Sequence, residues 1–139
     1  MNAIAEHEEV WAASVEDRPG ALANKLETLA EAGADLDFII ARRSPEKPGS
    51  GVVFVTPLRG DRELEAATEE GFTATSHLHS VRVEGKNEAG VAGKVAQQIA
   101  RAGLNLRGFS GAVIGTRFVL HLAFDTVEEA QRAIALLQR

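Results

Sequence analysis

Two short turns in the sequence carry residues that suit the binding of a small charged ligand. The first is Asp17-Arg18-Pro19-Gly20, followed by Ala21 and Leu22. The N–H groups at the start of a helix, with the helix dipole behind them, suit a carboxylate. Asp17 either caps that helix or binds an ammonium group, and Gly20 lets a ligand or a second chain approach the backbone closely. These groups together fit a free amino acid.

The same turn also has an ordinary structural interpretation. Pro19 has the φ angle of a helix start, so we expect it at the first helical position. An N-cap and a turn without any ligand would need the same residue types, and this alternative stays open. Because Gly20 lies in a turn and not in a core, we expect valine there to close the approach to the backbone and to leave the fold largely intact.

A second turn repeats the first one 70 residues later as Asn87-Glu88-Ala89-Gly90, followed by Val91. The match continues downstream: Leu29 falls on Ile99, Ala32-Gly33 on Ala102-Gly103, and Asp35-Leu36 on Asn105-Leu106. Because turn, cap and apolar positions coincide in order, the chain contains two copies of one unit. The second turn has a neutral Asn87 and no proline, so we expect the site headed by Asp17 to be the tighter one.

Hydrophobic periodicity predicts the elements that position these turns. Each copy begins with an alternating strand, at 10–15 and 79–83, and continues with a helix whose apolar stripe spans 22–29 or 91–99. Further strands are expected at 36–42, 52–56 and 72–76 in the first copy, and at 106–114 and 117–124 in the second. Second helices begin near Asp61 and near Thr126, where Thr126 and Glu129 fit a capping box.

The order of elements predicts an α+β fold of two ferredoxin-like βαββαβ units in tandem, with helices on one face of each antiparallel sheet. The expected domains are residues 8–76 and 77–139, and the second unit lacks its last strand. That missing strand would leave an uncovered sheet edge, and Val10, Ala12, Val119 and Ala123 would leave apolar open faces. Uncovered edges and apolar patches favour association, so we expect a homodimer.

The turn motifs in their strand–turn–helix context resemble the ACT domain family. The first copy has Asp17-Arg-Pro-Gly20-Ala-Leu-Ala before its helix and Ala-Gly-Ala-Asp35-Leu before the next strand; the second copy departs at Ala89, where the family commonly has proline. The resemblance covers nearly the whole chain. It implies small regulatory modules that bind amino acids or similar metabolites at domain interfaces and are usually attached to an enzyme. No enzyme domain is left over here, so a separate regulated enzyme is a candidate partner.

The resemblance also implies that the start of the second strand faces the turn across an interface. The corresponding residues are Asp37 in the first copy and Asn105 and Arg107 in the second. Asp37 and Arg107 would supply charged partners to a zwitterion. Solvated charges at a sheet edge are the alternative interpretation.

Composition and charge exclude several other classes of function. With 15 basic and 20 acidic residues, the net charge of −5 argues against nucleic acid or an anionic membrane as the main partner. The absence of cysteine excludes disulfides, thiol catalysis and Cys-ligated metals. No apolar run approaches the roughly 20 residues of a membrane helix, and the acidic N-terminus is unlike a signal peptide, so a cytoplasmic location is expected.

We expect no metal or cofactor site, because His77, His79 and His121 do not converge on one sheet surface as zinc ligands must. The sequence thus favours a non-enzymatic regulatory protein that binds an amino acid or a related metabolite. One alternative is a small ferredoxin-like enzyme of the isomerase or monooxygenase type. It needs a convergent acid–base pair, and His79 and Glu84 lie on opposite faces of their strand. Another alternative is an oligomerisation module without a ligand.

Overall fold

The computed structural model describes residues 2–138, which form two compact units. The first unit consists of residues 9–75, and the second joins residues 2–8 to residues 76–138. The ranges expected from the sequence, 8–76 and 77–139, left the N-terminal segment outside both repeats. In the structure this segment is a strand of the second unit.

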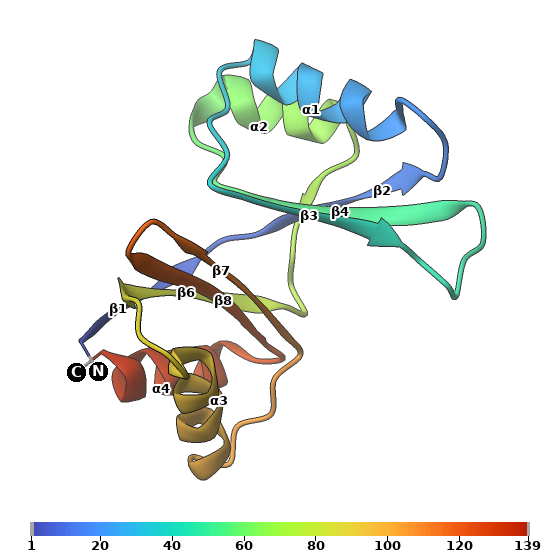
Figure 1. Cartoon of the computed structure of the whole chain (residues 1–139). Coiled ribbons are helices and arrows are strands. Elements are labelled where there is room, and N and C mark those ends of the chain that lie inside the picture. Colours follow the sequence, from blue (N-terminus) through green and yellow to red (C-terminus); the bar gives the residue numbers. More distant parts are fainter. Residues whose placement is uncertain (1, 139) are drawn as a thin grey trace. The chain divides into compact units, whose positions relative to one another are not determined.

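The first unit is a four-stranded antiparallel sheet with the order β3-β4-β2-β5 and two helices on one of its faces (Figure 1). Its strands are β2 (Trp11–Glu16), β3 (Phe38–Arg43), β4 (Ser50–Thr56) and the short β5 (Thr73–Ala74). Its helices are α1 (Ala21–Glu31) and α2 (Gly60–Glu69).

The second unit repeats this architecture with the strand order β1-β6-β8-β7 (Figure 1). Its strands are β1 (Ala3–Glu8), β6 (His79–Lys86), β7 (Gly108–Ile114) and β8 (Arg117–Phe124). Its helices are α3 (Val91–Arg101) and α4 (Val127–Leu137). The α+β class with two ferredoxin-like units is confirmed. So is Thr126 as the N-cap of α4, where Glu129 N–H donates to Thr126 Oγ1 at 3.1 Å and Thr126 Oγ1 lies 3.0 Å from Glu129 Oε1.

The N-terminal strand completes the second unit. In the described part of the chain, β1 lies beside β6 from Ala3 opposite Gly85 to Glu8 opposite Ser80. The expectation of an uncovered edge at β6 is therefore wrong. The expected apolar open face is also wrong at Val10, which is buried, whereas Ala12, Val119 and Ala123 are half-buried.

Contacts of Ala5 and Glu8 hold β1 in place besides its backbone pairing. The side chain of Ala5 is buried in the core of the second unit. On the outer side of β1, Ala5 N–H donates to Gln138 Oε1 at 2.6 Å. Glu8 Oε2 accepts a hydrogen bond from Ser80 Oγ at 2.8 Å and pairs with His121 Nδ1 at 2.5 Å, with only 11% of the Glu8 side chain exposed.

The two units differ in how fully their first helices are buried. On α3, Val91, Val95 and Ile99 are all buried in the core, as their spacing predicts. On α1, the equivalent positions Ala21 and Leu29 are buried, but Lys25 is half-buried, as are Leu22 and Leu26 of the expected stripe. The first helix of the first unit is therefore less buried than α3 at the middle of this stripe, at Lys25.

Candidate functional site

Helix α1 begins at Ala21, two residues after Pro19, which the sequence predicts as the first helical residue. Its N-cap is Gly20, whose φ of 86° is in the left-handed region that favours glycine, and Gly90 caps α3 in the same way with a φ of 84°. Neither cap has a side-chain hydrogen bond. The expectation that Asp17 or Asn87 caps a helix is therefore wrong, and Pro19 precedes the helix. The turn backbone provides an acceptor instead: Ala21 N–H donates to the Arg18 carbonyl at 3.3 Å, and Val91 N–H donates to the Glu88 carbonyl at 3.2 Å.

Asp17 is held against the β3–β4 connection. Its N–H donates to the Gly49 carbonyl at 3.1 Å, and its Oδ2 accepts a hydrogen bond from Arg43 Nε at 2.9 Å. The equivalent Asn87 N–H donates to the Thr116 carbonyl at 2.8 Å. In both units the backbone of the turn is thus tied to the neighbouring hairpin, and in the first unit the Asp17 carboxylate already has a cationic partner.

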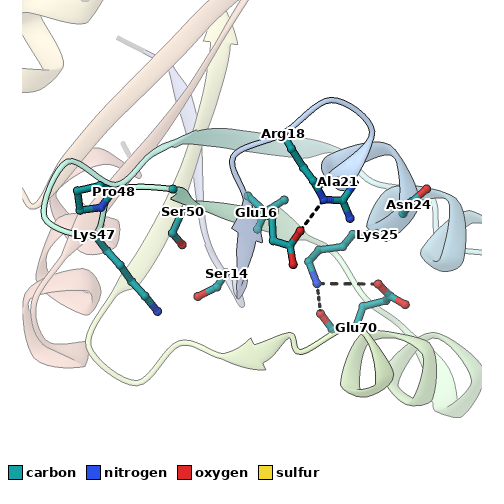
Figure 2. Close-up of a pocket in the computed structure, with 12 residues that line it drawn as sticks. Ser14, Glu16, Arg18, Ala21, Asn24, Lys25, Lys47, Pro48, Ser50 and Glu70 are labelled. Atoms are coloured by element: carbon teal, nitrogen blue, oxygen red, sulfur yellow. Dashed lines mark hydrogen bonds and ion pairs between the residues drawn. The ribbon is translucent and has the colours of Figure 1, made fainter.

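A cavity of about 540 Å³ lies beside the first turn, within the first unit (Figure 2). Its lining comes from β2, from the turn with α1, from the β3–β4 connection, and from the end of α2. These residues are Ser14, Val15, Glu16, Arg18, Ala21, Asn24, Lys25, Lys47, Pro48, Gly49, Ser50 and Glu70. Both signs of charge therefore surround one concave site.

Lys25 links α1 to the end of α2 inside this cavity (Figure 2). Its Nζ donates to the carbonyl oxygen of Glu70 at 2.5 Å and lies 3.9 Å from Glu70 Oε1, and 19% of its side chain is exposed. Glu70 is the C-cap of α2, and the C-terminal end of a helix favours a cation. The Lys25 ammonium is therefore fixed in position, with part of its surface open to the cavity.

Glu16 and Arg18 form a second charged pair at the cavity wall (Figure 2). Arg18 Nε donates to Glu16 Oε2 at 2.5 Å, and this hydrogen bond and the charge of the guanidinium hold the pKa of Glu16 below its ordinary value. Both side chains are mostly exposed. At neutral pH this wall thus presents one ionised carboxylate and one guanidinium to solvent.

The residues predicted for the first site lie around the turn, but only two of them line the cavity. Arg18 and Ala21 do so, whereas Asp17, Pro19, Gly20 and Leu22 do not. The Asp37 N–H donates to the Thr56 carbonyl at 2.9 Å, and its side chain is exposed. A role for these residues in binding a ligand stays a prediction.

The residues predicted for the second site have their own local partners. Glu88 pairs with Lys94 at 3.1 Å, and Arg107 pairs with Asp125 at 2.9 Å. Val91 is buried in the core of the second unit. The remaining four predicted residues are exposed: Asn87, Ala89, Gly90 and Asn105.

Sequence reasoning missed Lys25, Glu70 and the segment 47–50. The repeat itself held a signal for Lys25, because the equivalent position in the second copy is the core residue Val95. A charged residue at a position that the other copy buries marks a place where the first unit is open. The longer β3–β4 connection, residues 44–49 against residues 115–116, was visible too, but its contact with the turn was not.

Within residues 2–138, no cluster of three or more histidine, aspartate or glutamate side chains is arranged to hold a metal ion. His121 lies against Glu8 on the sheet of the second unit, where it is part of the fold. None of the helices in this part of the chain is long and apolar enough to span a membrane.

Comparisons with known proteins identify the fold. The ACT domain family model matches residues 13–70, the part of the first unit that contains the turn, both helices and every residue that lines the cavity. No curated protein sequence matches the chain.

Solved structures match over nearly the full length. Protein BT0572 from Bacteroides thetaiotaomicron is 14% identical with a TM-score of 0.77, covering 97% of this chain and 90% of its own. The regulatory subunits of aspartate kinase from Thermus thermophilus and Thermus flavus are 21% and 23% identical, with TM-scores of 0.64 and 0.59; each match covers 100% of this chain and 98% of theirs. Both units thus share the fold of these structures, and residues 13–70 match the ACT domain family model.

Proposed function

We propose that this chain is a regulatory protein that binds a free amino acid, or a closely related metabolite, in the cavity of the first unit. The observation that carries the proposal is the placement of both signs of charge around one concave site beside the ACT turn. The carboxylate of a zwitterion meets the cations Lys25, Arg18 and Lys47. Its ammonium meets Glu16 or Glu70, and charge-assisted hydrogen bonds of this kind are the strong ones.

The names of the structural neighbours support a regulatory role without catalysis. Two of them are regulatory subunits of aspartate kinase. We infer by analogy that this chain has no enzymatic activity of its own, that it acts on a separate enzyme, and that it works in the cytoplasm. The ligand acts by stabilising one conformation or assembly of the chain over another.

A thermal-shift screen of the twenty amino acids, followed by calorimetry, tests the ligand. We expect the amino acid that raises the melting temperature to bind Lys25→Met at least about tenfold more weakly, because one charge-assisted hydrogen bond is lost. The control is Lys94→Met, which removes an exposed lysine from the first turn of α3 in the second unit. It should bind as tightly as the wild type.

Two results would contradict the proposal in different ways. Equal binding by wild type and Lys25→Met would place the ligand elsewhere. If no amino acid or close analogue binds at millimolar concentration, the ligand-binding function fails and the oligomerisation module takes its place.

Substitution at Gly20 is a poorer test than the sequence suggested. No atom lies within 4 Å of a Cβ built there, but the φ of 86° is one that a β-branched residue adopts only under strain. Valine at 20 would therefore destabilise α1 by about 1–2 kcal/mol whether or not a ligand binds. The expectation that this variant leaves the fold intact is corrected on that ground.

We further propose that the chain forms a homodimer through the edge strand β7. Within residues 2–138, this strand pairs only with β8; it contains no charged residue and exposes Phe109, Val113 and Ile114. Unpaired, uncharged edges favour strand pairing between chains. Light scattering should give twice the chain mass of 14.8 kDa at micromolar concentration, and Val113→Lys should return it to the monomer. A mass near 14.8 kDa for the wild type throughout that range would contradict the dimer.

A further inference from the structure

The first strands of the two units differ in what lies along one of their edges. In the second unit, β1 pairs with β6 over six residues. In the first unit, β5 occupies the corresponding edge of β2 but pairs only with Trp11 and Ala12. Residues 13–16 of β2 therefore have no strand beside them on that edge within the described part of the chain.

The backbone groups that face this open edge follow from the hydrogen bonds at the two ends of β2. The Val10 carbonyl accepts from Thr75 N–H at 3.0 Å on the β5 side, whereas Asp17 N–H donates to Gly49 on the β4 side. In an antiparallel sheet these directions alternate along a strand, so Ser14 and Glu16 face the open edge. The Glu16 carbonyl already accepts from Arg18 N–H at 2.9 Å. The N–H and C=O of Ser14 and the N–H of Glu16 can therefore form backbone hydrogen bonds with an added strand.

The cavity lies at this edge, because Ser14, Val15 and Glu16 line it. Its other wall contains Glu70, the C-cap of α2. The cavity thus lies between the open edge of β2 on one side and the end of α2 on the other.

The second unit shows what fills the equivalent space. There Ile4 lies opposite Glu84, the repeat equivalent of Ser14, and Ala5 lies opposite Val83. The outer side of this strand is held by Gln138, the C-cap of α4, which accepts from Ala5 N–H. The cavity of the first unit and β1 of the second unit thus lie between the same two features. One is the edge of the unit's first strand, and the other is the C-cap residue of its second helix.

We propose that the open edge of β2 binds an extended peptide segment of another protein, which adds to the sheet antiparallel to β2 between Ser14–Glu16 and Glu70. The occupant is a strand with small side chains toward the helices, because Ala3 and Ala5 have that orientation in β1 and the cavity is only about 540 Å³. Strand addition of this kind gains its affinity from main-chain hydrogen bonds. The N-terminal strand of a second copy is the poorer occupant, because its removal would break the contacts of Ala5 and Glu8 in its own unit.

The test uses the full chain and a capped peptide that copies residues 2–4, acetyl-Asn-Ala-Ile-amide, because in the register of β1 a longer copy would overlap Thr73, which already pairs with Ala12. In ¹⁵N NMR titrations we expect shifts and slower hydrogen exchange at the amides of Ser14 and Glu16. The amide of Glu84 is the internal control, because its edge is already covered by β1. Shifts confined to other regions, or none at millimolar peptide, would overturn the inference.

Two altered reagents test the pairing itself. N-methylation of the peptide isoleucine, whose N–H should face β2, should weaken binding at least about tenfold. Ser14→Pro removes the edge-facing N–H and should abolish binding, whereas Ser14→Ala keeps the backbone and should bind normally. If Ser14→Pro does not fold, the methylated peptide still tests the pairing. Equal binding of the methylated and unmethylated peptides to the wild type would overturn the inference.

These outcomes are separate from those for the amino acid. A chain that binds an amino acid through Lys25 but no peptide retains the proposed function and loses this inference. A chain that binds the peptide at Ser14 but no amino acid retains the inference alone.

Discussion

Lys25 and Val95 occupy equivalent positions on the first helices of the two units but have opposite environments. Val95 is fully buried in the core of the second unit. Lys25 lies at the cavity and donates to the end of α2. A single change from an apolar to a charged residue thus accompanies the change from a packed core to an open site on the same scaffold.

The turns beside these helices differ in the same direction. Glu16 and Arg18 line the cavity as a pair, and their equivalents Lys86 and Glu88 have the reversed charges. Glu88 pairs instead with Lys94, on the surface of α3. The second turn therefore keeps the backbone geometry of the first but not its pattern of charge, and a ligand with a defined polarity would distinguish the two.

The largest difference is the strand that covers each first strand. The second unit uses six residues of β1, and the first unit uses only the two residues of β5. The first unit, which has the shorter strand, therefore has an uncovered sheet edge and a cavity where the second unit has a paired strand and a packed core. We expect substitutions in the second unit to change the free energy of unfolding more than substitutions at the cavity of the first unit.

Deletion of residues 2–8 should have the largest effect. It removes the pairing along β6, the burial of Ala5 and the Glu8 contacts, so we expect the second unit to lose at least about 3 kcal/mol of unfolding free energy. Hydrogen exchange at β6 should become fast, while fluorescence of Trp11, the chain's single tryptophan, reports the first unit separately. Unchanged exchange at β6 would show that β1 adds nothing to that unit.

Exchanging the residues at the equivalent helix positions should give unequal effects. Val95→Lys buries an uncompensated charge and should cost about 3–5 kcal/mol of unfolding free energy. Lys25→Val should change it by about 1 kcal/mol or less, because the lost pair is only partly buried. Denaturant unfolding of both variants measures the difference. If both variants lost the same free energy of unfolding, positions 25 and 95 would be equally buried.

Removal of the Glu8 carboxylate tests the attachment of β1 at a single residue. Glu8→Ala removes the acceptor shared by Ser80 and His121 and should cost about 1–3 kcal/mol of unfolding free energy. Glu6→Ala is the matched control, since Glu6 is an exposed residue on the same strand. If both variants unfold at the same denaturant concentration, Glu8 does not anchor the strand.

The smallest effect concerns the ionisation of Glu16. NMR titration should find its pKa below that of an ordinary glutamate, and Arg18→Gln should raise it toward the ordinary value. A lowered carboxyl pKa contributes stability that is present at neutral pH and is lost as the pH falls through that lowered value. Because both side chains are exposed, the contribution to stability is small. If the pKa of Glu16 were unchanged in Arg18→Gln, the two side chains would not form an ion pair in solution.

Much of the fold could be predicted because it depends on local patterns. The strand at 117–124 and the helix that starts at Val91 follow directly from alternation and from helical spacing. The strand at Ala3–Glu8 was missed because its pairing partner lies more than 70 residues away, and a short segment without a neighbouring turn signal has no local mark. For the same reason, the open edge was expected in the wrong unit.

The candidate site could be predicted only at its turn. Arg18 and Ala21 belong to a contiguous motif, whereas Lys25, Lys47 and Glu70 come from separate elements. Asp17 was expected to be available for a ligand, yet it accepts a hydrogen bond from Arg43, a partner from another strand. Such contacts depend on how the elements pack, which no motif records.

The sequence by itself determined the doubled unit, its α+β class and the glycine turns, because periodicity and backbone preference act over short stretches of chain. Only the tertiary structure decided which strand completes which unit and where a cavity remains. Strand pairing joins residues far apart in the chain, and the same pattern of strands and helices is compatible with β6 being open or covered. The six residues of β1 fill one unit, and the two residues of β5 leave the other open.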